Sequence, residues 1–289
     1  MTSLHEFYYR LPARAGGFRP GSHLGTSLGH GQEFAAHMRL LDNPDPRRLD
    51  LRASLRNLRR EWLVRVHRQR VSVPVHAVVD VSASMRFGAR ASKLHVAADF
   101  LEGLGHSAFR AGDPVGMLAF DAVERTDLFV PARHSRGAGY AMSAMLREFA
   151  SAGASARAGG AEGLSQAAQR LADRQGLIFL VSDFHWALEV LDGILDMLAQ
   201  AYVVPMITWD PAEAEPPPGN ALLAVRDAES GRQRTLWVRK TLRAQWRDAV
   251  AARRARLDAL FLARGLRPIH LHGAFEAEAV SRYFLEAVA

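Results

Sequence analysis

The chain contains no cysteine, which excludes disulfide bonds and thiolate metal sites. This composition agrees with a reducing compartment, and we expect a cytoplasmic protein. Long apolar runs are also missing: the longest, residues 177–181 and 202–207, are far shorter than the roughly 18 residues of a membrane helix. The first residues show no basic segment followed by an apolar one, as a signal peptide would. We therefore expect no membrane insertion.

Lysine is scarce, since 35 of the 37 basic residues are arginine. Residues 1–74 carry 13 arginines and 6 acidic residues, a net charge of +7, whereas residues 75–289 are neutral. An arginine-rich segment can face a partner or simply reflect codon usage in a GC-rich genome. It contains no array of base-stacking aromatic residues and no known reading motif, so we expect no nucleic-acid binding.

Common catalytic motifs are absent as well. The sequence has no Gly-x-Ser-x-Gly elbow, no Walker loop and no His-Glu-x-x-His. His270 and His272 alternate on one predicted strand, but no third ligand is evident, so packing is favoured over metal binding. These absences favour a binding protein over an enzyme.

The most informative stretch is residues 75–88, where an apolar run stops at Asp80, Ser82 and Ser84. The run 75–79 predicts a strand buried on both faces. Ligands of open α/β sheets bind at the carboxyl ends of such strands. One carboxylate and two hydroxyls within five residues are hard oxygen donors that suit Mg²⁺. The alternative is a strand end with an ordinary helix cap, because Ser and Asp are also preferred there.

A second apolar run, 177–182, ends at Asp183. Because the carboxyl ends of parallel strands meet at one edge of a sheet, this acid should lie close to Asp80. The sequence therefore predicts a metal site formed by Asp80, Ser82, Ser84 and Asp183.

The order of predicted elements indicates an α/β fold over residues 75–289, with a doubly wound, mostly parallel, Rossmann-like sheet. A β-hairpin is expected as an insertion near 219–239. Residues 1–74 are expected to form an Arg-rich N-terminal arm, over 1–24, followed by an appendage that packs on the core. Within the appendage we expect a helix over 32–41 and a strand over 61–67.

The stretch Asp80-x-Ser82-x-Ser84 resembles the metal-ion-dependent adhesion site of von Willebrand factor A-type domains. Residues 177–184 resemble the fourth strand of that fold with its metal-site aspartate. Three further stretches, 29–34, 45–50 and 111–116, are similar to the domain-of-unknown-function 58 family. Members of this family are usually encoded beside MoxR-type AAA+ ATPases.

The resemblance implies a non-enzymatic interaction module that holds Mg²⁺, or Mn²⁺ or Ca²⁺, and offers an open coordination position to an acidic side chain of a partner. It implies a MoxR-type AAA+ ATPase as partner and a chaperone-like role in assembling or activating a client complex, for example a metalloenzyme such as a dehydrogenase. The alternative is a magnesium-dependent hydrolase or phosphotransferase using the same residues.

One position departs from the family pattern. Related sites take a threonine from a loop after a Gly-Gly pair, whereas here Gly159-Gly160 is followed by Ala161 and Glu162. Alanine cannot be a ligand. Three alternatives are open for the missing ligand: either Glu162 reaches into the site, or a water takes the position, or Ser165 replaces the threonine.

Overall fold

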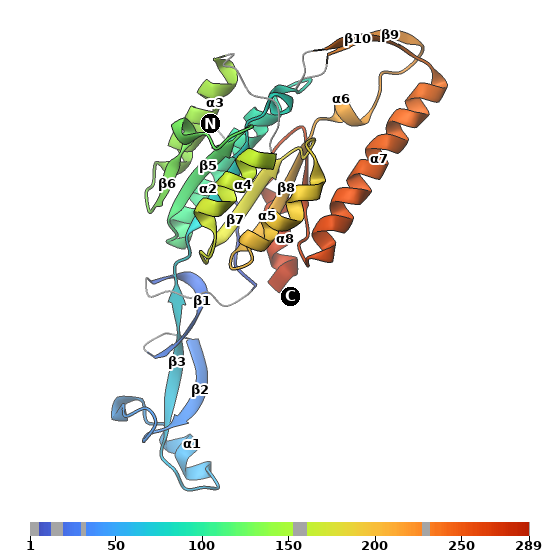
Figure 1. Ribbon diagram of the computed structural model, residues 1–289. Coiled ribbons are helices and arrows are strands. Elements are labelled where there is room, and N and C mark those ends of the chain that lie inside the picture. Colours follow the sequence, from blue (N-terminus) through green and yellow to red (C-terminus); the bar gives the residue numbers. More distant parts are fainter. Residues whose placement is uncertain (1–5, 13–19, 30–32, 153–160, 227–231, 289) are drawn as a thin grey trace.

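A computed structural model describes residues 6–12, 20–29, 33–152, 161–226 and 232–288. Its body is a six-stranded sheet in the order β11-β8-β7-β4-β5-β6 (Figure 1). All neighbouring strands are parallel except the edge strand β6, which is antiparallel to β5. This is the strand order of a doubly wound sheet, so the predicted fold class is confirmed. The strands are β4 Val75–Asp80, β5 Val115–Phe120, β6 Val130–Arg133, β7 Leu177–Ser182, β8 Tyr202–Trp209 and β11 Ile269–His272.

Helices cover both faces of the sheet. One buried cluster lies under α2 Lys93–Ala111, α3 Ala138–Ser151 and α8 Ala277–Val288. The other lies under α4 Ala161–Leu171, α5 Leu191–Met197 and α7 Lys240–Ala263. Short 3₁₀ turns connect elements at Ala83–Arg86 (η2), Thr126–Leu128 (η3) and Leu188–Val190 (η4). None of the helices in the described part of the chain is long and apolar enough to cross a membrane.

The central strands show why the apolar runs were informative. All six residues of β4 and all six of β7 are buried, as expected for parallel strands covered by helices on both sides. The helix after β4 begins where Ser92 caps it and ends at Gly112, whose φ of 79° favours glycine. Within this helix, a Cβ on Gly105 would lie 2.2 Å from the Cα of Gly139, so α2 and α3 pack with their backbones almost in contact.

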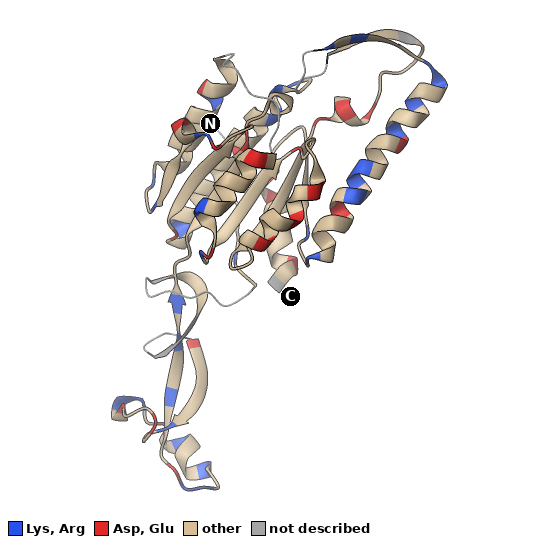
Figure 2. Ribbon diagram, in the orientation of Figure 1, with Lys and Arg blue, Asp and Glu red and all other residues tan. Residues whose placement is uncertain are grey.

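The appendage is a separate antiparallel sheet in the order β1-β3-β2, formed by Pro20–Gly29, Leu63–Val71 and Glu33–Arg39. It projects from the body instead of packing along it, with α1 Leu51–Arg56 and the 3₁₀ turn η1 Pro46–Arg48 at its far end (Figure 1). The predicted strand is confirmed as β3. The predicted helix over 32–41 is wrong, because this segment pairs with β3 and pairing overrides its local pattern. Basic residues are spread along this appendage (Figure 2).

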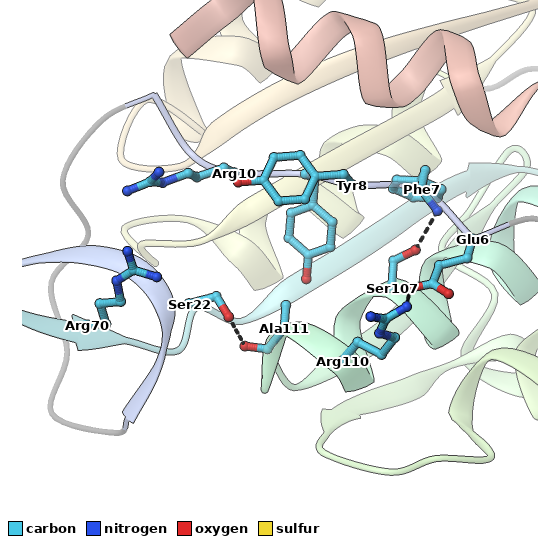
Figure 3. Close-up of a pocket in the computed structure, with 10 residues that line it drawn as sticks. Glu6, Phe7, Tyr8, Arg10, Ser22, Arg70, Ser107, Arg110 and Ala111 are labelled. Carbon is cyan, nitrogen blue, oxygen red and sulfur yellow. Dashed lines mark hydrogen bonds and ion pairs between the residues drawn. The ribbon is translucent and has the colours of Figure 1, made fainter.

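The first described residues are not a free arm. Phe7, Tyr9 and Leu11 are buried in the main core, at 4%, 4% and 7% exposure. In Figure 3 the backbone N–H of Phe7 donates to the Ser107 hydroxyl at 3.0 Å. The expectation that residues 1–24 lack a place in the core is therefore wrong for 7–11, because three alternating apolar residues are too short a pattern to stand out among Gly, Pro and Arg.

Tyr9 is also anchored through Asp113, which is fully buried two residues before β5 begins at Val115. Its carboxylate accepts hydrogen bonds from the Tyr9 hydroxyl at 2.6 Å and the Val73 N–H at 2.8 Å, and His23 Nε2 lies 2.7 Å away. Burial, then the nearby carboxylate, raise the pKa of Tyr9 well above its usual value. Asp113 thus joins the N-terminal segment to the body.

The expected hairpin is confirmed as β9 Ala221–Arg226 and β10 Gln233–Val238, which lead into α7. The connection before it contains a one-turn helix, α6 Pro211–Ala214. Asp210 and Glu213 form its capping box. This turn places Glu213 at the carboxyl edge of the sheet.

Candidate functional site

The candidate site lies where β4 and β7 end, side by side at the centre of the sheet. The chain leaves β4 toward β5 on one side and leaves β7 toward β8 on the other. Ligands of doubly wound folds bind at this reversal of direction. Since Val79 is paired with Val181, the next residues along the two strands, Asp80 and Ser182, are neighbours.

Asp80 is fully buried and surrounded by uncharged donors. Its Oδ1 accepts from the Ser82 N–H at 2.9 Å, and its Oδ2 accepts from the Ser182 hydroxyl at 2.6 Å and from Trp186 Nε1 at 3.2 Å. Burial, and next the negative charge of Asp183, raise the pKa of Asp80 to about 7 in spite of these hydrogen bonds. A cation bound beside it would stabilise the ionised form.

Ser82 and Ser84 are buried next to this carboxylate, and their hydroxyl oxygens lie 3.2 Å apart. Ser82 occupies the N-cap position of η2, yet its side chain makes no capping hydrogen bond. Helix α2 is capped by Ser92 instead. The helix-cap alternative therefore does not explain these two serines.

Asp183 has a different partner. Its Oδ2 accepts from the ammonium of Lys93 at 2.6 Å, and the same ammonium donates to Glu213 Oε1 at 2.6 Å. The side chains of Lys93 and Asp183 are 1% and 0% exposed, and that of Glu213 is 22% exposed. The carboxyl edge of β7 is thus neutralised by a buried lysine at the start of α2.

The loop after β7 is held in a strained conformation. Phe184, which is fully buried, has a φ of 53°, in the left-handed region that bulky residues seldom adopt. Such a residue costs about 1–3 kcal/mol and persists only where its surroundings enforce it. Here its N–H donates to the Ser182 hydroxyl at 2.9 Å, and Arg253 Nη2 donates to the carbonyls of Phe184 and Trp186. The loop therefore presents His185 and Trp186 in fixed positions.

Beside Asp183 lies a group of three potential ligands. Single ligand atoms of Asp183, His185 and Glu213 all lie within 4.8 Å of one another. Burial alone would raise the pKa of Glu213, but the nearby His185 ring and the charge of Lys93 lower it below its usual value. The His185 ring stacks on Trp209, with centroids 5.9 Å apart.

An open cavity of about 430 Å³ adjoins this group. It is lined by His185, Trp209, Glu213, Trp246 and Arg253, among others. Trp246 Nε1 donates to the carbonyl of Glu213 at 2.7 Å, which fixes α6 against α7. The carboxyl edge of the sheet is therefore accessible from the α7 side.

The structure brings together four of the five predicted site residues. Asp80, Ser82, Ser84 and Asp183 meet at the ends of β4 and β7. Glu162 is exposed in the first turn of α4, whereas Ala161 before it is half-buried. Gly159 and Gly160 lie outside the described residues.

Five contributors were missed: Lys93, Ser182, His185, Trp186 and Glu213. Ser182 directly precedes a predicted site residue, and its position on a buried strand was the only signal for it. Lys93 carried a clearer signal, because it is one of two lysines in an arginine-rich chain. Nothing local distinguishes Glu213, which is 120 residues from Lys93 in the sequence.

Comparison with known proteins identifies a family and several distant structures. A family model described as "Protein of unknown function DUF58" matches residues 44–256. No curated protein matches the chain. A conserved hypothetical protein, BatB, from Bacteroides thetaiotaomicron is 16% identical with a TM-score of 0.44, and the match covers 75% of this chain and 98% of that one.

Two other structures are similarly remote. An aerotolerance-related membrane protein from Bacteroides fragilis is 14% identical with a TM-score of 0.43, over 75% of this chain and 98% of that one. Proximal thread matrix protein 1 from the mussel byssus, with a zinc-occupied MIDAS motif, is 14% identical with a TM-score of 0.34, over 48% of this chain and 38% of that one. Likeness at these values assigns no role to any residue of this chain.

Proposed function

The chain belongs to the DUF58 family, and from this premise we propose that it is a von Willebrand A-type interaction module. In this proposal the edge formed by Asp80, Ser82 and Ser84 binds a divalent cation and an acidic side chain of a partner protein. The partner is a MoxR-type AAA+ ATPase in the cytoplasm. Together they assemble or activate a client complex, for which a metalloenzyme such as a dehydrogenase is one candidate.

One observation carries the proposal: a buried carboxylate and two adjacent buried hydroxyls lie at the switch point of the sheet, with no capping role for Ser82. Buried polar groups without a structural task cost stability, so their presence favours a ligand. The three oxygen donors indicate the ligand class, and burial, which raises the pKa of Asp80 to about 7, makes its ionisation costly. A positive charge at this point offsets the cost of ionising it.

The donors fit a hard cation. The side chains of Asp80, Ser82 and Ser84 supply three oxygens: Asp80 Oδ1 accepts from the Ser82 N–H, and the two serine hydroxyls lie within hydrogen-bonding distance of each other. Mg²⁺, Mn²⁺ and Ca²⁺ prefer such oxygen ligands. Within the described part of the chain these three side chains do not complete six-fold coordination, so a bound ion would leave positions for a partner's carboxylate. The protein's own contribution is to hold the three oxygens in place through η2 and the strand ends.

A binding role is favoured over catalysis because the sequence contains none of the common hydrolase motifs. Asp80 Oδ2 accepts two hydrogen bonds, from Ser182 and Trp186, whereas Oδ1 accepts one, from Ser82, and keeps a lone pair for a cation. These observations support interaction over the hydrolase or phosphotransferase alternative.

The test is capture of the cognate MoxR-type ATPase by the purified chain. We expect wild type to capture it, and chelator or Asp80→Ala to abolish capture while the melting curve stays cooperative. The matched control is Asp248→Ala, an exposed acid on α7 that should capture normally. Equal capture in every condition would place docking elsewhere, with the Arg-rich N-terminal segment as the next region to examine.

The same preparations decide the enzymatic alternative. An interaction module should not hydrolyse phosphoesters, whatever metal is added. Metal-dependent turnover that disappears in Asp80→Ala would instead support the hydrolase or phosphotransferase.

A further inference from the structure

Lys93 occupies an unfavourable position that only its partners explain. A buried ammonium loses its hydration, and a cation in the first turn of a helix opposes the helix dipole. Lys93 is the first residue of α2 and its side chain is 1% exposed, so both effects apply. Sequence rules broken at one position, without a local gain, often mark a functional position.

Two carboxylates, each at the same distance from Lys93 Nζ, compensate for the lost hydration of the ammonium. Lys93 Nζ lies 2.6 Å from Asp183 Oδ2 and 2.6 Å from Glu213 Oε1, and these acids belong to different elements. His185 Nε2 lies 3.7 Å from the same oxygen of Glu213. The ligand atoms of Asp183, His185 and Glu213 lie within 4.8 Å of one another. The Lys93 ammonium contacts the two carboxylates among them.

This set of ligands is suited to a metal ion. Two carboxylates and one imidazole are ligands of Zn²⁺ and Mn²⁺ in proteins. Here the chain supplies the positive charge itself, with an ammonium that donates to both carboxylates.

We propose that Lys93 takes the place of a metal ion between Asp183, His185 and Glu213. This half of the carboxyl edge then has its own counter-charge and is ordered without metal, and removing the side chain of Lys93 uncovers a metal site. The inference deepens the proposed function, on which it rests only for the role of the edge as a whole. It leaves Asp80, Ser82 and Ser84 as the residues that a divalent ion contacts in the native chain.

The consequence for a partner follows from geometry. Asp183 is buried against α2 and paired with Lys93, so its need for an ion is met within the chain and its repulsion of an incoming carboxylate is reduced. Metal dependence is confined to the Asp80 side. A fixed ammonium also keeps α2, the loop after β7 and α6 together before any partner arrives.

The decisive experiment counts bound Mn²⁺ in the full chain by titration calorimetry and by the electron paramagnetic resonance signal of the free ion. We expect Lys93→Ala to bind one more Mn²⁺ per chain than wild type. Lys93→Met is the matched control, because methionine also removes the charge but fills the space, and it should gain no ion. Adding Glu213→Gln to Lys93→Ala should remove the extra ion.

Equal Mn²⁺ counts for wild type and a folded Lys93→Ala would overturn the inference. If Lys93→Ala does not fold, the single variant Glu213→Gln decides the question, because this side chain is partly exposed. Mn²⁺ affinity should then change less than twofold from wild type. A tenfold loss would show that Glu213 is a metal ligand in the native chain and that Lys93 does not replace the ion.

The two proposals fail separately. Ion counting uses the isolated protein and needs no partner, whereas capture of the ATPase by Asp80→Ala does not involve Lys93.

Discussion

Asp80 and Asp183 end neighbouring parallel strands and are both fully buried, yet their surroundings differ. Uncharged donors hold Asp80: a backbone N–H, a serine hydroxyl and an indole N–H. Asp183 contacts the ammonium of Lys93. Burial is therefore the same on the two sides, and the difference lies in whether the chain supplies a counter-charge.

The difference divides the carboxyl edge of the sheet into two functional halves. A buried ion pair with further hydrogen bonds is costly to break, because removing one partner leaves an uncompensated charge. A buried carboxylate held only by neutral donors responds to its conditions, since a proton or a cation can neutralise it. The Asp183 half is thus structural, and the Asp80 half is the one able to respond to a ligand.

The largest effect should follow from breaking the ion pair. Asp183→Asn leaves the buried ammonium of Lys93 with only Glu213, and we expect a loss of about 3–5 kcal/mol in the free energy of unfolding. Urea denaturation measures it. Asp248→Asn, at an exposed position, should leave the midpoint unchanged. A loss no larger than that of the control would mean that Lys93 and Asp183 are not a buried pair in solution.

The second effect is the pH dependence that Asp80 imposes. Its pKa is about 7 in the folded chain and near 3.8 when unfolded. Between pH 3.8 and pH 7 the native state therefore binds a proton that the unfolded state has lost. Stability should therefore be full below about pH 4, fall as the pH rises toward 7, and stay level above it, by a few kcal/mol in all. Asp80→Asn should remove this slope in urea midpoints between pH 4 and 8, without added metal. A slope that persists in the variant would assign the titration to another group.

A third buried carboxylate sharpens the comparison. Asp113 accepts from the Tyr9 hydroxyl at 2.6 Å and from a backbone N–H, with His23 beside it. Tyr9→Phe should cost about 1.5–3 kcal/mol, the range for a hydrogen bond to a charged group. Tyr8→Phe is the control, because the Tyr8 side chain is 53% exposed and should be insensitive. Equal midpoints for the two variants would show that the N-terminal segment does not hold Asp113.

The smallest effect concerns the missing threonine of the Asp80 half. A Cβ on Gly163 would lie 2.3 Å from the carbonyl oxygen of Asp121, so the start of α4 packs against the end of β5, next to β4. Ala161→Thr should tighten Mg²⁺ binding a few-fold by adding an oxygen ligand. Glu162→Thr, at an exposed position, should leave the affinity unchanged. Calorimetric titration distinguishes the two, and the reverse order would mean that the register after Gly160 is shifted by one residue.

Local sequence was sufficient to predict the central strands and the Asp80 half of the site. β4 and β7 are continuous apolar runs that stop at an acid, and such runs have few alternatives in an α/β chain. Asp80, Ser82 and Ser84 are close in sequence, so their proximity is almost guaranteed. Asp183 required one further step, the convergence of parallel strands at one edge.

The remainder depends on contacts between distant parts of the chain. Lys93 meets Glu213 across 120 residues, and Phe7 meets Ser107 across 100. The misassigned segment that forms β2 depends on its pairing with β3 for its conformation. No periodicity within a window of ten or twenty residues contains this information.

The burial of Phe7 and Tyr9 also bears on how the protein is made. Phe7 stacks against Phe100 and contacts Phe275, and Tyr9 contacts Phe284 in the last helix. Phe7 and Tyr9 therefore complete a core that also needs α8, which lies far along the sequence. During synthesis these two side chains stay uncovered until α8 has left the ribosome, so this part of the core closes late, and chains truncated before α8 should be those that chaperones retain.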